Sequence, residues 1–318
     1  GHASYQHLPT INFHHKTRKF IPSGVYNDGP FLEKGLENGF MKVKNNNKVK
    51  FALMWANHDW VDLFPRNPDI GPAPLFYPGA MTPKNFDKMT DYIIANYFSQ
   101  PTYWKIDGCP YFSFYELFRF IEGMGGKEKA LEALEKFRAK TKKAGFKDLH
   151  LNGVVWGVQI LPNEKVLKKP AELLDYLSFN STTSYVWIHH VALPAFPETE
   201  YKDVQDKYFK YCDEFSKTIK QPYYPNVTMG WDASPRCSKK FTFRSAEYPC
   251  MAIMKNNTLE NFLNALQVSK SWIDAAPTKN KIITINSWNE WTEGSILEPE
   301  RQYGYQYLEK IKAVFKKK

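Results

Sequence analysis

The stretch KVKFALMWAN, residues 48–57, decides the fold class that we predict for this chain. It is a short apolar run without turn-forming residues, which is typical of a parallel strand covered on both faces. After a Pro-rich loop, Thr82 followed by Pro83 predicts the start of a helix, with Thr82 as the N-cap and Pro83 in the first turn. A strand followed by a helix is the repeating unit of α/β proteins.

The same unit recurs along the rest of the chain. We predict strands at 110–116, 149–157, 176–182, 223–230 and 281–287, and helices at 127–144, 163–175, 201–219, 258–274 and 303–316. Six such units without an internal linker favour an α/β fold, a (β/α)8 TIM-type barrel in a single domain over residues 5–318; a doubly wound open sheet is the alternative. Residues 5–47 contain one clear helix, about 31–41, and weak strands near 10–14 and 20–26, so we expect the N-terminal units to be irregular or abbreviated. Residues 1–4 resemble a cloning remnant.

The composition excludes membrane-spanning and disordered chains. With 43% hydrophobic and 24% charged residues among 318, the chain can bury a sizeable core, and no run approaches the roughly 20 apolar residues of a membrane span. The net charge of +10 comes from dispersed basic residues, so we interpret it as a solvated surface and expect no nucleic-acid partner. Aromatic residues make up 16%, an excess that also suits sugar binding, because pyranose faces stack on aromatic rings.

The Cys and His residues do not form a recognisable metal motif. No pair among the four Cys has zinc-ligand spacing, and the adjacent His189 and His190 are poorly placed to bind one ion. We therefore expect no metal and no cofactor. Cys237 and Cys250 could bridge a loop in an oxidising compartment. No leader is recognised, and a periplasmic or secreted protein is the expectation.

Residues that directly follow the predicted strands are rich in Trp, Tyr, His and carboxylates. In a parallel barrel, functional groups gather at this end of the strands, and this composition is typical of a cleft that binds carbohydrate. The candidate substrate-binding residues are Trp55, Asn57, His58, Asp59, Trp60, Tyr185, Trp231, Asp232, Arg236, Trp288, Asn289 and Trp291. Two alternatives stay open: Asp232 and Arg236 could form an ion pair that shapes their loop, and His58 and Asp59 could cap a loop.

Glu290 and Glu293 are the candidate catalytic residues. They lie three positions apart on a turn that leaves the strand 281–287, so their side chains should lie on one side, about 5–6 Å apart. Glycosidic cleavage needs one carboxylic acid to protonate the leaving oxygen and one carboxylate as base or nucleophile. Crowding the two groups among Trp rings would push their pKa values apart. The alternative is that one Glu pairs with a Lys or Arg and the other is merely exposed.

These motifs resemble a known pair of families. The run Asn289 to Gly294, followed by Glu298-Pro299, resembles the signature of the endo-α-mannosidase-like glycoside hydrolases (family 99) and of the related WbsX-type glycosyltransferase-like proteins. The resemblance spans about residues 27–305, and the segments 55–60, 107–110 and 230–236 are similar to the WbsX type. It implies a (β/α)8 barrel, with Glu293 as general acid/base and Glu290 as the partner carboxylate, which in the mannosidases is thought to deprotonate a sugar 2-hydroxyl. His58-Asp59 stands where the WbsX type has Glu-Asn.

Three functions are compatible with these features. The leading hypothesis is a glycoside hydrolase that cleaves a poly- or oligosaccharide with the paired glutamates. A nucleotide-sugar-dependent glycosyltransferase of polysaccharide biosynthesis would need a diphosphate site, and we find neither an Asp-x-Asp motif nor a Gly-rich phosphate loop. A non-catalytic carbohydrate-binding protein would keep the aromatic residues but would not need both carboxylates. The expected partner is a carbohydrate, and the sequence carries no signal for an oligomeric state.

Overall fold

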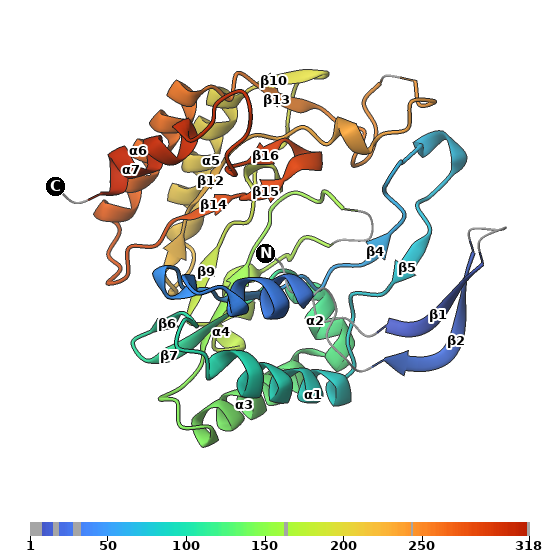
Figure 1. The fold of residues 1–318 in the computed structure, drawn as a ribbon, viewed down its shortest axis with the longest axis vertical. Coiled ribbons are helices and arrows are strands. Elements are labelled where there is room, and N and C mark those ends of the chain that lie inside the picture. Colours follow the sequence, from blue (N-terminus) through green and yellow to red (C-terminus); the bar gives the residue numbers. More distant parts are fainter. Residues whose placement is uncertain (1–7, 15–18, 28–32, 162–164, 243, 317–318) are drawn as a thin grey trace. The chain divides into compact units, whose positions relative to one another are not determined.

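The computed structural model describes residues 8–14, 19–27, 33–161, 165–242 and 244–316 (Figure 1). Contacts divide the chain into two compact units. The first comprises Gly1–Val61, Leu75–Val155 and Lys169–Ser181, and the second comprises Asp62–Pro74, Trp156–Lys168 and Thr182–Lys318. The suspected cloning remnant, residues 1–4, lies outside the described residues, and a single domain over 5–318 stays a prediction.

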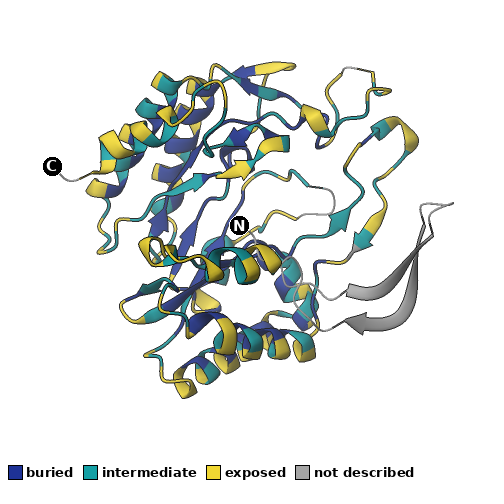
Figure 2. Cartoon of the chain, in the orientation of Figure 1, coloured by how far each residue is buried: buried dark blue, intermediate teal, exposed yellow. Residues whose placement is uncertain are grey.

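The first unit contains three parallel strands with β7 in the middle. They are β3 (Leu53–Trp55), β7 (Cys109–Phe114) and β8 (His150–Val154), and the short β6 (Lys105–Ile106) pairs with β7 in antiparallel fashion. The helices are α1 (Pro83–Ile93), α2 (Leu117–Met124), α3 (Lys127–Lys143) and α4 (Pro170–Tyr176). Strand β7 is buried on both faces, as its apolar sequence predicts, and Figure 2 shows buried strands beside helices with exposed outer faces.

The N-terminal part is irregular, as expected. Strands β1 (Leu8–His14) and β2 (Lys19–Asn27) form an antiparallel hairpin, and so do β4 (Trp60–Val61) and β5 (Leu75–Tyr77). The helix predicted at about 31–41 is present as a π-helical turn at 35–39 and a 3-10 turn at 40–42 rather than as a regular α-helix, and residues 31–32 lie outside the described residues. Gly35 and Gly39 bracket the π turn, and each Gly inside an α-helix costs about 1 kcal/mol relative to Ala.

The second unit also has parallel strands at its centre. They are β9 (Ser181–Thr183, of which Ser181 belongs to the first unit), β11 (Tyr223–Tyr224), β12 (Asn226–Thr228) and β14 (Thr284–Asn286). Strand β11 pairs with β9, and β12 pairs with β14. Pro225 separates β11 from β12, so the strand predicted at 223–230 is divided in two. The helices are α5 (Tyr201–Ser216), α6 (Leu259–Ala275) and α7 (Gln306–Phe315), and β10 (Glu198–Glu200) pairs with β13 (Ile253–Lys255).

The α/β class with parallel strands is therefore confirmed. Each predicted strand from 48–57 onward overlaps an observed strand, although the one predicted at 176–182 forms only from Ser181. The predicted helices beyond residue 80 are present, although α4 begins only at Pro170. Helix α2 was not predicted, and closure into a (β/α)8 barrel stays a prediction. Within the part of the chain that the structure describes, no helix is both long and apolar enough to span a membrane.

Candidate active site

The two glutamates lie on a tight hairpin at the end of the chain's last parallel strand, β14. Strands β15 (Asn289–Glu290) and β16 (Ser295–Ile296) pair in antiparallel fashion around the 3-10 turn η8 (Trp291–Glu293). Glu293 lies in this turn and Glu290 directly precedes it, and both side chains reach the same guanidinium, that of Arg236. Gly294 ends this turn with φ +65°, a conformation that favours Gly.

The segment that follows β12 supports this hairpin directly. The backbone N–H of Asp232 donates to the carbonyl of Glu293 (2.8 Å), and the Ser295 hydroxyl donates to the carbonyl of Gly230 (2.6 Å). A Cβ on Gly230 would lie 2.9 Å from the carbonyl oxygen of Gly294 and 2.4 Å from the Asn257 amide nitrogen. The close approach of the two backbones therefore requires Gly at position 230.

Arg236 connects the two candidate carboxylates. Its Nη2 donates to Glu290 Oε1 (2.7 Å), and its Nη1 lies 3.1 Å from Glu293 Oε1. Its Nε donates to Thr292 Oγ1 (2.8 Å), and that hydroxyl lies 3.2 Å from Glu290 Oε1. Arg236 thus binds the carboxylates of both glutamates. The Asp232 carboxylate instead accepts a hydrogen bond from Ser234 N (2.9 Å) and caps the turn before Arg236.

Glu293 is the more buried glutamate, with its side chain 12% exposed. Its Oε1 accepts a hydrogen bond from the Tyr248 phenol, which in turn accepts one from Arg236 Nη1. Burial raises the pKa of Glu293 above its usual range; Arg236 and the Tyr248 hydrogen bond oppose this rise, and the charge of Glu290 adds to it. Tyr185 lies within electrostatic range of the same pair, because burial and then the charges of Glu293 and Glu290 raise the pKa of its phenol.

The candidate tryptophans divide into two kinds. Trp288 and Trp291 leave 48% and 50% of their surface exposed, and Trp291 Nε1 donates to Glu298 Oε2 (3.1 Å). Trp231 and Trp55 are 3% and 2% exposed. The Trp55 ring packs among Phe86, Phe114 and Phe120, which favours a structural role. Trp60 is half-buried, and whether the exposed rings line one sugar-binding groove stays a prediction.

The candidates that follow β3 gather in the first unit and are bonded to their surroundings. The buried Asn57 side chain donates to the carbonyl of Glu116 (2.6 Å) and accepts from its N–H (2.8 Å). Asp59 accepts from Gly79 N (2.8 Å) and Arg119 Nη2 (2.7 Å), while His58 Nδ1 lies 2.9 Å from the carbonyl of Asp59. These contacts fit the alternative of a capped loop. Substrate contact by these residues, and by the exposed Asn289, stays a prediction.

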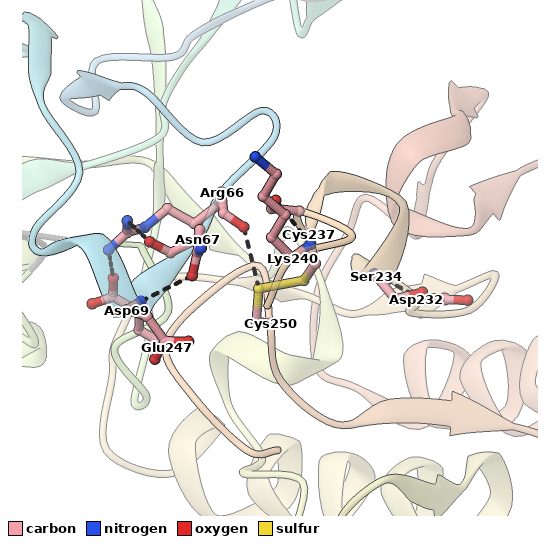
Figure 3. Close-up of a disulfide and its surroundings, with 10 residues drawn as sticks. Arg66, Asn67, Asp69, Asp232, Ser234, Cys237, Lys240, Glu247 and Cys250 are labelled. Carbon is pink, nitrogen blue, oxygen red and sulfur yellow. Dashed lines mark hydrogen bonds and ion pairs between the residues drawn. A yellow bond between two sulfur atoms is a disulfide. The ribbon is translucent and has the colours of Figure 1, made fainter. Parts of the chain in front are cut away.

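Sequence reasoning missed two residues of the site, Tyr248 and Thr292. Tyr248 lies in a loop far along the chain from the glutamates, and the only signal for it was the pair of Cys residues that enclose its loop. Cys237 and Cys250 form a disulfide with a Cα–Cα distance of 5.6 Å (Figure 3). This is the bridge that the two Cys residues allow in an oxidising compartment.

Nothing in the described ranges resembles a metal centre: no group of three or more His, Cys, Asp or Glu side chains there could hold an ion. The site in the second unit is instead two carboxylates, one guanidinium and two phenols. Such a set can donate and accept protons and can bind hydroxyl groups.

The family model described as "Glycosyltransferase WbsX" matches residues 26–311. The chain belongs to the WbsX family. The resemblance seen in the sequence motifs is thereby confirmed. Two curated relatives of this WbsX-family chain, both named "Uncharacterized protein WxcX" and from two strains of Xanthomonas campestris pv. campestris, are 33% identical over 91 residues. The match covers 27% of this chain and only 11% of the length of either relative.

Solved structures resemble the WbsX-family chain in fold. The GH99 endo-alpha-mannosidase from Bacteroides thetaiotaomicron has a TM-score of 0.50 at 14% identity, over 85% of this chain and 62% of that protein. A structure described as a glycoside hydrolase-like protein has a TM-score of 0.56 at 13% identity, over 88% of this chain and 74% of that one. At these identities the likeness concerns the fold alone.

Proposed function

We propose that this WbsX-family chain is a glycoside hydrolase that cleaves a poly- or oligosaccharide with Glu293 and Glu290. The observation that carries the proposal is the pair itself: two carboxylates on one turn bind a single guanidinium, and burial raises the pKa of Glu293. Such a site provides the acid and the carboxylate that glycosidic cleavage requires. The GH99 endo-alpha-mannosidase and the glycoside hydrolase-like protein among the solved structures support the same interpretation. A closed (β/α)8 barrel is our proposal for the complete fold.

In this proposal the two glutamates move protons in opposite directions. Protonated Glu293 gives its proton to the glycosidic oxygen as the bond to the leaving sugar breaks. Glu290, held by Arg236 and the Thr292 hydroxyl, accepts a proton from the 2-hydroxyl of the sugar, whose oxygen bonds to the anomeric carbon as the bond to the leaving sugar breaks. Water then opens this 1,2-anhydro ring: ionised Glu293 takes a proton from the water and Glu290 returns its proton to the 2-oxygen, so both glutamates regain their starting states. One water is consumed for each bond cleaved. The exposed rings of Trp288 and Trp291 would stack on pyranose faces beside the reacting bond.

The second candidate is a nucleotide-sugar-dependent glycosyltransferase, which the description of the family favours. Both activities would use a carbohydrate, and they differ in the donor: a hydrolase transfers a glycosyl group to water, whereas a transferase consumes a nucleotide sugar. A non-catalytic carbohydrate-binding protein would bind glycans but would neither cleave them nor consume a nucleotide sugar.

The test is to incubate the protein with a panel of polysaccharides and oligosaccharides and with nucleotide sugars. We expect new reducing ends from at least one glycan and no consumption of nucleotide sugar. Glu293→Gln should lower kcat by at least ~10²-fold, the scale of general acid catalysis. The matched control is Glu309→Gln, an exposed residue of α7 that should keep wild-type activity. Nucleotide-sugar consumption that survives Glu293→Gln would reject the hydrolase assignment.

We also propose that the protein acts in an oxidising compartment, the periplasm or the cell exterior. The Cys237–Cys250 disulfide supports this location, because disulfides persist in such compartments and are rare in the cytosol. Trapping free thiols in protein freshly isolated from its native cells tests the proposal. We expect Cys237 and Cys250 to resist alkylation until a reductant is added.

A further inference from the structure

The Tyr248 phenol lies between two groups of the candidate site. It donates its hydrogen bond to Glu293 Oε1 and accepts one from Arg236 Nη1. The ring is buried, and the Arg236 guanidinium also lies 5.8 Å from its centroid. A buried phenol needs a hydrogen-bond partner, and here that partner is the glutamate proposed as the acid. Tyr248 therefore fixes where the Glu293 carboxyl group points.

The loop that carries Tyr248 is closed at both ends. The Cys237–Cys250 disulfide joins the residue after Arg236 to a residue two positions beyond Tyr248 (Figure 3). Closing a loop of this size removes conformational freedom that the open loop would otherwise have. The disulfide thus ties the backbone of Arg236 and the backbone of Tyr248 to one another.

Arg66 closes the same loop a second time. Its backbone N–H donates to the carbonyl of Arg236 (2.8 Å), and its carbonyl accepts from Ser238 N (2.7 Å). Its guanidinium, 4% exposed, donates to the carboxylate of Glu247, the neighbour of Tyr248. One buried arginine therefore binds the start and the end of the loop. The disulfide and Arg66 therefore both restrict where the backbone of Tyr248 can lie.

We propose that Tyr248 is a positioning residue for Glu293, and that the loop closed by Cys237–Cys250 and Arg66 holds its phenol against that carboxylate. The inference rests on the proposed function, since Glu293 is there the general acid. Tyr248 does not need to touch the sugar in order to act. It orients the acid and, as a hydrogen-bond donor to the ionised carboxylate, adjusts the pH at which the acid loses its proton.

The sign of this effect follows from the groups around Glu293. Burial and the charge of Glu290 favour the protonated acid, whereas Arg236 and Tyr248 favour the carboxylate. Tyr185 stays neutral in the working range, because burial raises the pKa of its phenol. Asp232 contacts Glu293 through its backbone N–H, which donates to the Glu293 carbonyl. Removing the Tyr248 hydroxyl should therefore raise the pKa of Glu293.

The first test is Tyr248→Phe, which keeps the ring and removes the hydroxyl. We expect kcat to fall about 10-fold and the basic limb of the pH–rate profile to move up by about one pH unit. The matched control, Tyr176→Phe on the exposed surface of α4, should change neither. Loss of activity with an unmoved basic limb would mean that Tyr248 only supports the fold, and would overturn the proposal.

The second test does not depend on finding a substrate. A double-mutant cycle of urea unfolding compares the wild type, Tyr248→Phe, Glu293→Gln and the double variant across pH 4 to 9. We expect a coupling between the two residues that grows as pH rises and Glu293 ionises. A coupling that is absent, or equal at every pH, would overturn the positioning role. Failure of the proposed function alone would instead leave this coupling present in a protein that cleaves no glycan.

The third test concerns the loop closure. The double variant Cys237→Ser/Cys250→Ser should lower kcat and move the basic limb in the same direction as Tyr248→Phe. In a Tyr248→Phe background, removing the disulfide should change the profile little further, because both variants act through one contact. Fully additive effects would show that the disulfide acts through something other than Tyr248.

Discussion

Each unit of the molecule contains an arginine bound to a carboxylate that is almost buried. In the first unit Arg119 binds Asp59, which is 9% exposed, and in the second unit Arg236 binds Glu293, which is 12% exposed. The remaining partners differ. The other oxygen of Asp59 accepts from the backbone N–H of Gly79, whereas Glu293 accepts from the Tyr248 phenol and lies near a second carboxylate, Glu290.

The partners of the two carboxylates indicate which of them is suited to chemistry. The donors on both oxygens of Asp59 tie the loop after β3 to Gly79 and Arg119. Around Glu293, burial and a like charge oppose two donors, and the net result is a raised pKa. A buried carboxyl group with a raised pKa and a second carboxylate beside it is more typical of an active site than of a structural ion pair.

Neutralising each carboxylate in turn should have the largest and most different effects. Glu293→Gln should lower kcat by at least ~10²-fold yet leave the fold intact. Asp59→Asn should instead lower stability and leave kcat unchanged. Because it places an amide donor or a neutral oxygen against Arg119, we expect the free energy of unfolding to fall by about 1–3 kcal/mol. Kinetics on a cleaved glycan and urea unfolding measure the two effects. A large loss of kcat in Asp59→Asn with unchanged stability would place Asp59 in the reaction instead.

The raised pKa of Glu293 also predicts how the stability of the protein changes with pH. Because the pKa of Glu293 is raised in the folded state, its contribution to stability is fully present below its ordinary value of 4.5 and is lost as pH rises through the raised value. Glu293→Gln mimics the protonated form and should not suffer this loss. We therefore expect its melting temperature to exceed that of the wild type at pH 8 and the difference to shrink at pH 4. A wild type that is the more stable protein at pH 8 would contradict the raised pKa.

A smaller effect is expected when each arginine is replaced by lysine. Arg236 binds Glu290, Glu293 and Thr292 through three different nitrogens, and a lysine cannot reproduce this planar arrangement. Arg236→Lys should lower kcat/KM about 10-fold. Arg119→Lys is the matched control in the first unit, and it should reduce stability without changing kcat. Equal kinetic effects of the two substitutions would remove the distinction between the sites.

The sequence predicted those features of the site that depend on local structure. The spacing of Glu290 and Glu293 was sufficient to place both side chains on one side, because Glu293 lies in a 3-10 turn that Glu290 directly precedes. The pairing of Arg236 with these glutamates was not predictable, since it depends on β12 lying beside β14. Tyr248 was missed for the same reason: no local pattern indicates that a loop returns to a distant turn.

The fold shows the same division between local and distant determinants. Helix α1 begins at Pro83, as Thr82-Pro83 predicts, because N-terminal helix signals act within a few residues. The burial of Trp55 was not evident from its place at a strand end, because it depends on Phe86 and Phe120 from two helices. The exposure of a side chain at a strand end therefore depends more on its tertiary contacts than on its residue type.

The smallest expected effect concerns the exposed rings beside the glutamates. Trp291→Ala and Trp288→Ala should each raise KM several-fold with little change in kcat, because stacking on a sugar contributes on the order of 1 kcal/mol per ring. Tyr305→Ala is a suitable control, since this ring is 68% exposed and lies outside the motif. Glu298→Gln should reproduce part of the Trp291 effect, because Glu298 Oε2 accepts from the indole N–H and fixes the plane of the ring. If both Trp variants keep the wild-type KM on a long glycan, these rings do not bind the substrate, and sugar recognition must come from other residues around Glu290 and Glu293.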